Sequence, residues 1–92
     1  MNSGNPTNGF SGNREEVMDL VREHLVNELE LKPEQITEEA RFKEDFDADS
    51  LDLYELVMEL EDRYGISVSE REAGQISTVG DAVDFVMAKA GA

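Results

Sequence analysis

The sequence predicts an all-α fold, a small four-helix bundle with a long loop between the first two helices and a short third helix. Apolar residues recur at helical spacing in three segments, no segment shows convincing strand-like alternation, and no internal repeat is present. The chain has 92 residues, enough for one small domain. Residues 1–13 are rich in Asn, Gly and Ser, so we expect a flexible tail there and the domain over residues 14–92.

The first predicted helix begins near Arg14 and ends before Pro33, because proline disfavours helical geometry in the residue before it. One face of this helix carries a stripe typical of a buried surface: Val17, Leu20, Val21, His24 and Leu25. A loop follows from about Lys32 to Asp49, which is long for so small a domain and therefore expected to be functional or well anchored. Its expected anchors in the core are Ile36, Ala40, Phe42 and Phe46.

The second predicted helix runs from about Ser50 to Tyr64, and Gly65 is placed to end it. At 100° per residue, one side of this helix forms an apolar face for the core: Leu53, Leu56, Val57, Leu60 and Tyr64. The opposite side carries a second apolar set, here called the outer stripe: Leu51, Tyr54 and Met58. Acids lie beside the outer stripe, and the nineteen residues from Glu44 to Asp62 contain nine acids and no base. This combination predicts a docking surface for a basic partner with an apolar centre, whereas acids alone indicate only a solvated face.

The last part of the chain predicts a short helix and a longer one. One or two helical turns are expected within residues 70–75, after a short apolar link at Ile66 and Val68. Thr78 and Asp81 have the spacing of a capping box and predict the start of the fourth helix. The inward residues of that helix are expected to be Val79, Ala82, Val83 and Val86.

Composition excludes several classes of function. Twenty-two acids against eight bases give a net charge of −14, which argues against nucleic acid or an anionic membrane as a partner and favours basic proteins. With no cysteine and one histidine, the chain has no thiol nucleophile, no disulfide and no cysteine-based metal site. We find neither a secretion signal nor a segment of transmembrane length, and we expect a cytoplasmic monomer.

Ser50, set among acids at a helix start, is the main candidate functional residue, and its simplest role is that of an N-cap. A hydrolase nucleophile is disfavoured, because the one histidine falls on the buried stripe and no G-x-S-x-G motif surrounds the serine. A calcium loop starting at Asp45 is also disfavoured: Ser50 stands where glycine is required and Leu56 where a bidentate glutamate is required. A helical adaptor without a prosthetic group remains an alternative.

The segment DADSLD at residues 47–52, followed by LYELVMELEDRYGISVSE and then ISTVGDAVDFV, resembles the acyl carrier protein family. The resemblance covers roughly residues 17–86. It implies that Ser50 accepts 4′-phosphopantetheine from coenzyme A through a magnesium-dependent phosphopantetheinyl transferase. It also implies that the thiol of this arm carries acyl groups as thioesters, while the chain itself has no catalytic residue and no metal site.

The resemblance assigns further residues by their place in the motif. Asp49 and Leu51 flank the modified serine. The expected docking residues toward acyl-transfer, condensing and reducing enzymes are Asp52, Tyr54, Glu55, Met58, Glu59 and Asp62. The expected acyl pocket between the helices consists of Leu53, Leu56, Val57, Leu60, Ile66, Ala73 and Ile76.

Three positions depart from the family pattern. Asp47 stands where the family usually has glycine, Tyr54 replaces a smaller aliphatic residue, and Glu59 replaces a small one. The acidity and the Ser-Leu-Asp motif look like those of a free-standing carrier for fatty-acid synthesis. Tyr54 keeps a dedicated carrier for polyketide or specialised lipid synthesis as the alternative.

Overall fold

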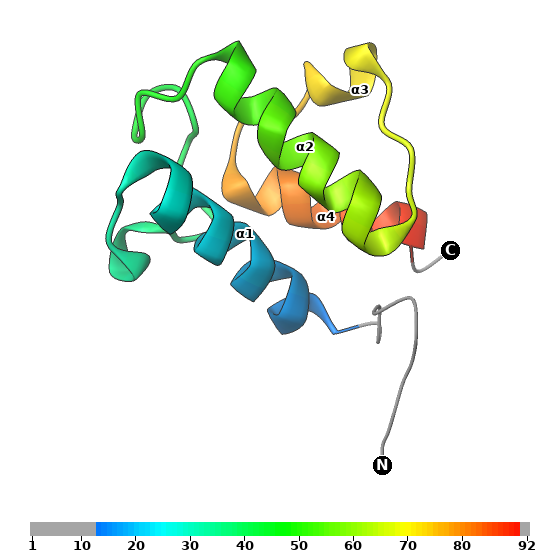
Figure 1. Cartoon of the computed structure of the whole chain (residues 1–92), viewed down its shortest axis with the longest axis horizontal. Helices are drawn as coiled ribbons and strands as arrows, with labels where there is room; N and C mark the ends of the chain where they lie inside the picture. The colour runs from blue at the N-terminus through cyan, green and yellow to red at the C-terminus, as the bar shows by residue number, and fades with distance from the viewer. Residues whose placement is uncertain (1–12, 91–92) are drawn as a thin grey trace.

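The computed structural model describes residues 13–90, and within them the regular secondary structure is helical, apart from one isolated bridge between Arg41 and Thr78 (Figure 1). The elements are α1 (Arg14–Leu29), the 3-10 turn η1 (Pro33–Gln35), α2 (Ser50–Tyr64), α3 (Glu70–Ala73) and α4 (Val79–Ala90). The predicted all-α class is therefore confirmed. The predicted tail lies outside the described residues except for Asn13, whose side chain caps α1 by accepting a hydrogen bond from the Glu15 amide at 2.8 Å.

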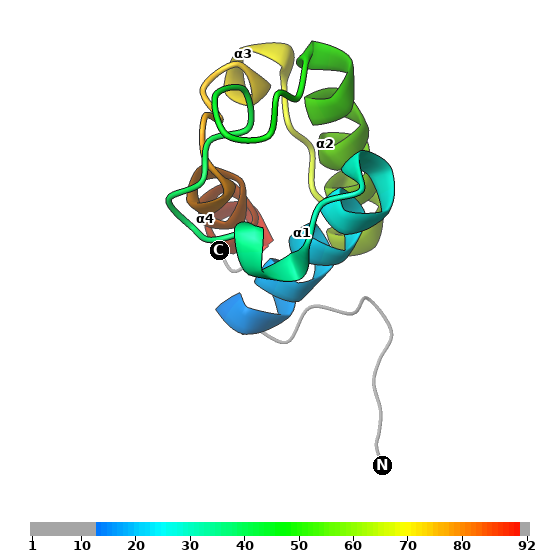
Figure 2. The same cartoon turned by 90° about the vertical axis from the view of Figure 1, so that its left-hand side faces the viewer.

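The three longer helices share one core, and the short helix α3 lies beside it. α1, α2 and α4 contact one another, and α3 packs against α2 (Figures 1 and 2). The faces predicted to be apolar point inward, so that Val17, Val21, Leu56 and Val83 are completely buried. Leu53 is the exception on α2, since it is only partly buried and packs at the edge of this core.

α1 and α2 both end at a residue in the left-handed conformation, but only one of these residues is a glycine. Gly65 ends α2 as predicted, in the left-handed conformation with φ 64°, and the Ile66 amide bonds back to the Glu61 carbonyl at 3.3 Å. α1 ends at Leu29, where Glu30 adopts the same left-handed conformation with φ 56° although it is not a glycine. The sequence carries no glycine to mark this earlier end.

The predicted capping box at the start of α4 is present. The Thr78 hydroxyl accepts a hydrogen bond from the Asp81 amide at 3.1 Å, and the Asp81 carboxylate accepts one from the Thr78 amide at 3.1 Å. Aspartate therefore fulfils the role that glutamate or glutamine usually has in this motif.

The long segment between α1 and α2 is anchored, as its apolar residues predicted. Ile36, Ala40, Phe42 and Phe46 are all buried, and the two phenylalanine rings pack edge to face at 6.2 Å. The segment also bonds to the residues before α4, through a bridge between Arg41 and Thr78 and a 3.0 Å hydrogen bond from the Phe42 amide to the Ser77 carbonyl.

Arg14 links the segment between α1 and α2 to both α1 and α4. Its guanidinium, at the start of α1, reaches Glu38 in the loop and Asp84 on α4, each at 2.7 Å. The hydrogen bonds from Arg14 hold the pKa of the Glu38 carboxyl below its ordinary value. The Glu38 backbone contributes as well, because its carbonyl accepts the Gly80 amide at 2.9 Å, and a side chain at Gly80 would approach that carbonyl to 3.1 Å.

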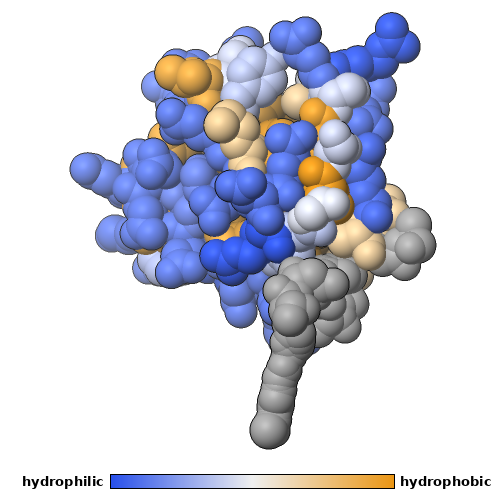
Figure 3. Space-filling view, turned by 45° about the vertical axis from the view of Figure 1, so that its right-hand side comes forward, coloured by the Kyte–Doolittle hydropathy of each residue, from blue (hydrophilic) through white to orange (hydrophobic). Residues whose placement is uncertain are grey.

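The surface is mostly polar. Figure 3 shows a face covered largely by hydrophilic residues, with hydrophobic ones in small separate patches. Within residues 13–90, the large hydrophobic side chains that are exposed are those of the outer stripe: Leu51 at 65%, Tyr54 at 39% and Met58 at 63%. No described helix is both long and apolar enough to cross a membrane.

Candidate functional site

Ser50 is the first residue of α2, but it is not the N-cap. Asp49 caps the helix: its carboxylate accepts the Asp52 amide at 3.0 Å, and the Asp52 carboxylate accepts the Asp49 amide at 3.1 Å. The simple N-cap interpretation of Ser50 is therefore wrong, because a neighbouring aspartate satisfies the helix start. The Ser50 side chain is exposed and makes no hydrogen bond to any residue that the structure describes.

The turn before Ser50 explains how the chain tolerates Asp47 in place of glycine. Asp47 has φ 56°, in the left-handed region that glycine adopts most easily and aspartate more readily than most residues. Its amide bonds to the Lys43 carbonyl at 3.1 Å, and the next amide, that of the buried Ala48, bonds to the Phe42 carbonyl at 2.9 Å. Phe42 therefore positions the start of α2 through a direct backbone bond as well as by filling the core.

Ser50 lies at a cleft of about 500 Å³, here called the Ser50 cleft. The cleft is lined by residues of the loop, of α2 and of the segment before α4: Arg41, Phe42, Lys43, Glu44, Ala48, Asp49, Ser50, Leu53, Ile76 and Ser77. Two cationic side chains and several apolar ones therefore surround a serine whose immediate neighbours in sequence are acidic or apolar.

The structure brings two of the seven predicted acyl-pocket residues to the Ser50 cleft, namely Leu53 and Ile76. The other five are buried or partly buried away from its lining: Leu56, Val57, Leu60, Ile66 and Ala73. These five residues thus belong to the apolar core, or pack against it, rather than line the cleft.

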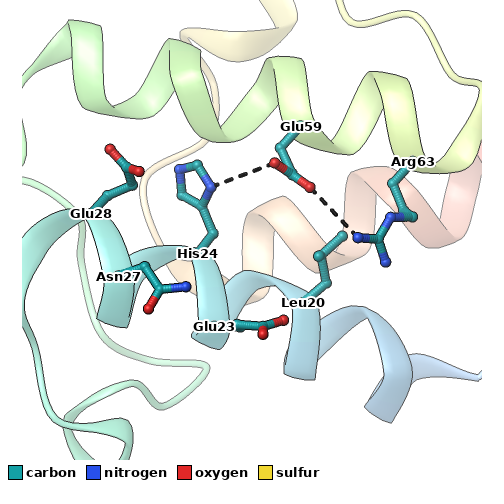
Figure 4. Close-up of a pocket in the computed structure, with 7 residues that line it drawn as sticks. All are labelled: Leu20, Glu23, His24, Asn27, Glu28, Glu59 and Arg63. Carbon is teal, nitrogen blue, oxygen red and sulfur yellow. Dashed lines mark ion pairs between the residues drawn. The ribbon is translucent and has the colours of Figure 1, made fainter.

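The four acids among the predicted docking residues divide into two groups. Glu55 and Asp62 are exposed beside the outer stripe and form no ion pair with another described residue. Asp52 is engaged in the cap of α2, and Glu59 points toward α1, with its carboxylate 4.0 Å from His24 Nδ1 and 3.7 Å from an Arg63 guanidinium nitrogen (Figure 4). Of these four acids, Glu55 and Asp62 are therefore the ones whose charge is not already engaged by the fold.

His24 lies in a separate small pocket of about 180 Å³ between α1 and α2 (Figure 4). Its side chain is only 11% exposed, and its Nε2 is buried without a hydrogen-bond partner among the described residues. Since His24 does not line the Ser50 cleft, it is not placed to act as a base for Ser50. This agrees with its assignment to the inward face of the first helix.

Nearby carboxylates are also occupied by backbone groups. Asp45 accepts the Arg41 amide at 2.7 Å, and Asp49 caps α2, so two of the acids considered for a calcium loop serve the fold. Within the part of the chain that the structure describes, no group of three or more acids or histidines is arranged to hold a metal ion.

Sequence reasoning missed the cationic side of the Ser50 cleft. Arg41 and Lys43 precede the acidic run, and nothing in helical periodicity relates a loop to the start of the next helix. The usable signal was their position beside Phe42, because a buried anchor fixes its two neighbours at the surface.

A helical bundle that displays an unbonded serine at a helix start, beside a partly apolar cleft, is the architecture of a carrier domain. The family model described as "Phosphopantetheine attachment site" matches residues 19–86. The chain is also similar to a solved structure of the acyl carrier protein from Enterococcus faecalis, with 38% identity, a TM-score of 0.73, and coverage of 83% of this chain and 96% of that one. The chain belongs to the acyl carrier protein family.

Membership confirms the resemblance seen in the sequence and defines the general role. The protein is a non-enzymatic carrier, its cofactor is 4′-phosphopantetheine, and its partners include a phosphopantetheinyl transferase and acyl-handling enzymes. The residues of the Ser50 cleft fit this cofactor chemically. A hydroxyl is available for a phosphodiester, Arg41 and Lys43 suit the phosphate, and Leu53 and Ile76 suit the aliphatic arm.

Proposed function

We propose that Ser50 is the attachment serine and that the chain delivers acyl thioesters to the enzymes of fatty-acid synthesis, as a cytoplasmic monomer. The observation that supports this most is the state of the Ser50 hydroxyl. It is exposed, it makes no hydrogen bond to a described residue, and the capping role that could have engaged it belongs to Asp49. Ser50 also lies at a cleft that combines cationic and apolar linings next to a helix start.

The modification needs little from the chain beyond presentation of the hydroxyl. The Ser50 oxygen forms a bond to the phosphorus of coenzyme A that bears the pantetheine, and adenosine 3′,5′-bisphosphate leaves. In this proposal the transferase supplies the magnesium ion and the base that takes the serine proton. The thiol of the attached arm then holds the acyl group as a thioester.

The acyl group is proposed to enter the bundle through the Ser50 cleft. Leu53 and Ile76 form its apolar entrance, and behind them lie Leu56, Val57, Leu60, Ile66 and Ala73. Since these inner side chains are buried or partly buried in a packed core, an acyl chain is proposed to enter by a local separation of the helices around them. Apolar burial of each methylene would offset that separation by about 0.8 kcal/mol.

Partner enzymes are proposed to bind the outer stripe together with the exposed acids Glu55 and Asp62. Exposed apolar side chains at the centre and carboxylates at the edge suit a basic surface with an apolar centre. Asp52 and Glu59 stay in this proposal as edge residues whose charges are already partly engaged by the fold. Tyr54, a phenol 39% exposed on this stripe, supports the second candidate, a dedicated polyketide or specialised-lipid carrier.

Mass measurement tests the attachment site. The unmodified protein is incubated with coenzyme A, Mg²⁺ and a broad-specificity phosphopantetheinyl transferase, and intact and peptide masses are recorded. Wild type and a Ser77→Ala control, altered at another serine of the same cleft, should each gain one phosphopantetheine, whereas Ser50→Ala should gain none. An unchanged wild-type mass, or a gain that survives Ser50→Ala, rejects the assignment.

Reconstitution tests the pathway. The modified and malonylated protein is supplied to purified condensing and reducing enzymes of fatty-acid synthesis, and the acyl products on the carrier are followed by mass. Successive two-carbon elongation and reduction supports the fatty-acid role. Modification without any elongation, in a system that elongates a known fatty-acid carrier, favours the dedicated carrier.

A further inference from the structure

We propose that Lys43 is a positioning residue that binds the phosphate of the arm on Ser50 and holds the start of the arm over the Ser50 cleft. This inference rests on the proposed attachment at Ser50 and goes beyond it, because it assigns a role to a loop residue outside the motif. The class of ligand is a phosphodiester anion linked to the adjacent serine.

Lys43 is the cation of the cleft that is available to an anion. It lines the Ser50 cleft together with Ser50, its side chain is exposed, and it forms no ion pair or side-chain hydrogen bond within residues 13–90. Arg41, the other cation, lies 3.8 Å from the Asp45 carboxylate, which also accepts the Arg41 amide. Its charge is therefore already partly compensated.

The backbone holds Lys43 in a fixed place relative to Ser50. The Lys43 carbonyl accepts the Asp47 amide at 3.1 Å, and the neighbouring Phe42, 4% exposed, accepts the Ala48 amide at 2.9 Å. The Phe42 amide in turn bonds to the carbonyl of Ser77, another residue of the cleft, at 3.0 Å. Because backbone hydrogen bonds hold both Phe42 and Lys43 in place, the Lys43 ammonium group can reach the cleft without rearrangement of the loop.

The positive charge of Lys43 matters because the other charged residues near Ser50 in the sequence are mostly acidic. Glu44, Asp47, Asp49 and Asp52 all lie within six residues of Ser50 and repel a phosphate there. A charge-assisted contact with one ammonium group opposes that repulsion on the side of the cleft, so the arm is directed toward Leu53 and Ile76 rather than into solvent. Since the site is open to water, the contact should weaken as ionic strength rises.

Nuclear magnetic resonance of the lysine side chains and of phosphorus tests the proposal without measuring acyl transfer. Spectra of the unmodified and the modified protein are compared at low and high salt. The matched control residue is Lys32, which lies in the same inter-helix segment, forms no ion pair in the described part of the chain and does not line the cleft. The variants are Lys43→Gln and Lys32→Gln, each modified completely at Ser50.

On modification, the Lys43 ε-methylene resonance should move and the Lys32 resonance should stay, and added salt should reduce the Lys43 shift. Lys43→Gln should move the phosphorus resonance and remove contacts between the arm and Leu53 or Ile76, while Lys32→Gln should leave both unchanged. Unmoved Lys43 signals, or a phosphorus resonance unaffected by Lys43→Gln, overturn the proposal when masses prove Ser50 modified. If the mass shows no modification at Ser50, the proposed function has failed and this inference fails with it.

Discussion

Two hydrogen bonds join the guanidinium of Arg14 to the carboxylate of Glu38, from Nη2 to Oε1 at 2.7 Å and from Nε to Oε2 at 3.1 Å. The residues are 24 positions apart, and the same guanidinium bonds Asp84 at 2.7 Å. One side chain thus connects the start of α1 with the inter-helix segment and with α4. Its parallel, two-bond geometry is the arrangement in which an arginine pair contributes most for a given exposure.

Arg14→Gln should lower the melting temperature by a few degrees at pH 7, and the difference should disappear in acid. The contact with Arg14 lowers the folded pKa of Glu38, so this carboxylate stabilises the fold above its ordinary pKa of 4.5. That stabilisation is lost as the pH falls through the lowered folded pKa. Thermal melts of dilute protein from pH 7 to pH 3 measure the effect.

Arg71→Gln is the control for this prediction, since it removes the same charge from an exposed arginine without a described ion pair. It should change the melting temperature less than Arg14→Gln does at pH 7. Equal losses for both variants, or an Arg14→Gln loss that persists unchanged at pH 3, would show that the contact does not contribute as described.

Asp49→Ala should destabilise the protein by about 1 kcal/mol, because the Asp52 amide loses its acceptor at the start of α2. Asp49→Asn keeps an acceptor oxygen and should retain most of the stability. Urea unfolding followed by circular dichroism measures both. If Asp49→Asn is as destabilised as Asp49→Ala, the charge rather than the cap is what matters at this position.

Gly65→Ala should cost roughly 1 kcal/mol, because an alanine must adopt the left-handed φ of 64° there. Space is not the cause, since nothing lies within 4 Å of the added Cβ. Gly74→Ala is the matched control: its φ is −66° and its Cβ would make ordinary contacts, so stability should hold or rise slightly. Equal losses at the two glycines in urea unfolding would contradict this explanation.

Glu55→Lys and Asp62→Lys should slow binding to the phosphopantetheinyl transferase and flatten its salt dependence, because charges at the edge of an interface act mainly on the encounter. Met58→Ala should instead speed dissociation, as the loss of a buried apolar contact does. Stopped-flow or surface-based kinetics at several ionic strengths separate the two effects. Glu28→Lys on α1, with the same charge change on an exposed acid, is the control, and an equal effect there would place the docking surface elsewhere.

Helical periodicity and end signals predicted most of the fold. The stripe on the first helix, the inner face of α2 and the Gly65 stop all follow from spacing and from one residue type with a special conformation. Ser50 was singled out as the candidate site from local sequence, because a serine in an acidic run at a helix start is unusual enough to notice.

The contacts that depend on tertiary distance could not be predicted. Arg14 with Glu38, His24 with Glu59, and Lys43 at the Ser50 cleft each join segments whose separation the sequence does not specify. The left-handed Glu30 and the choice of Asp49 over Ser50 as N-cap were missed for a different reason. Several residue types tolerate these positions, so identity alone does not decide which one adopts the conformation.

In the described chain, the exposed large hydrophobic residues all lie on α2. This arrangement affects how the carrier can pass from one enzyme to another. If enzymes bind the outer stripe as proposed, residues 13–90 offer no second such surface for another enzyme, and Ser50 begins the same helix. Enzymes that use this surface must therefore take turns, and each handover requires complete departure of the previous one. The lifetime of each complex, rather than its strength at equilibrium, then sets how quickly a growing chain passes from one enzyme to the next.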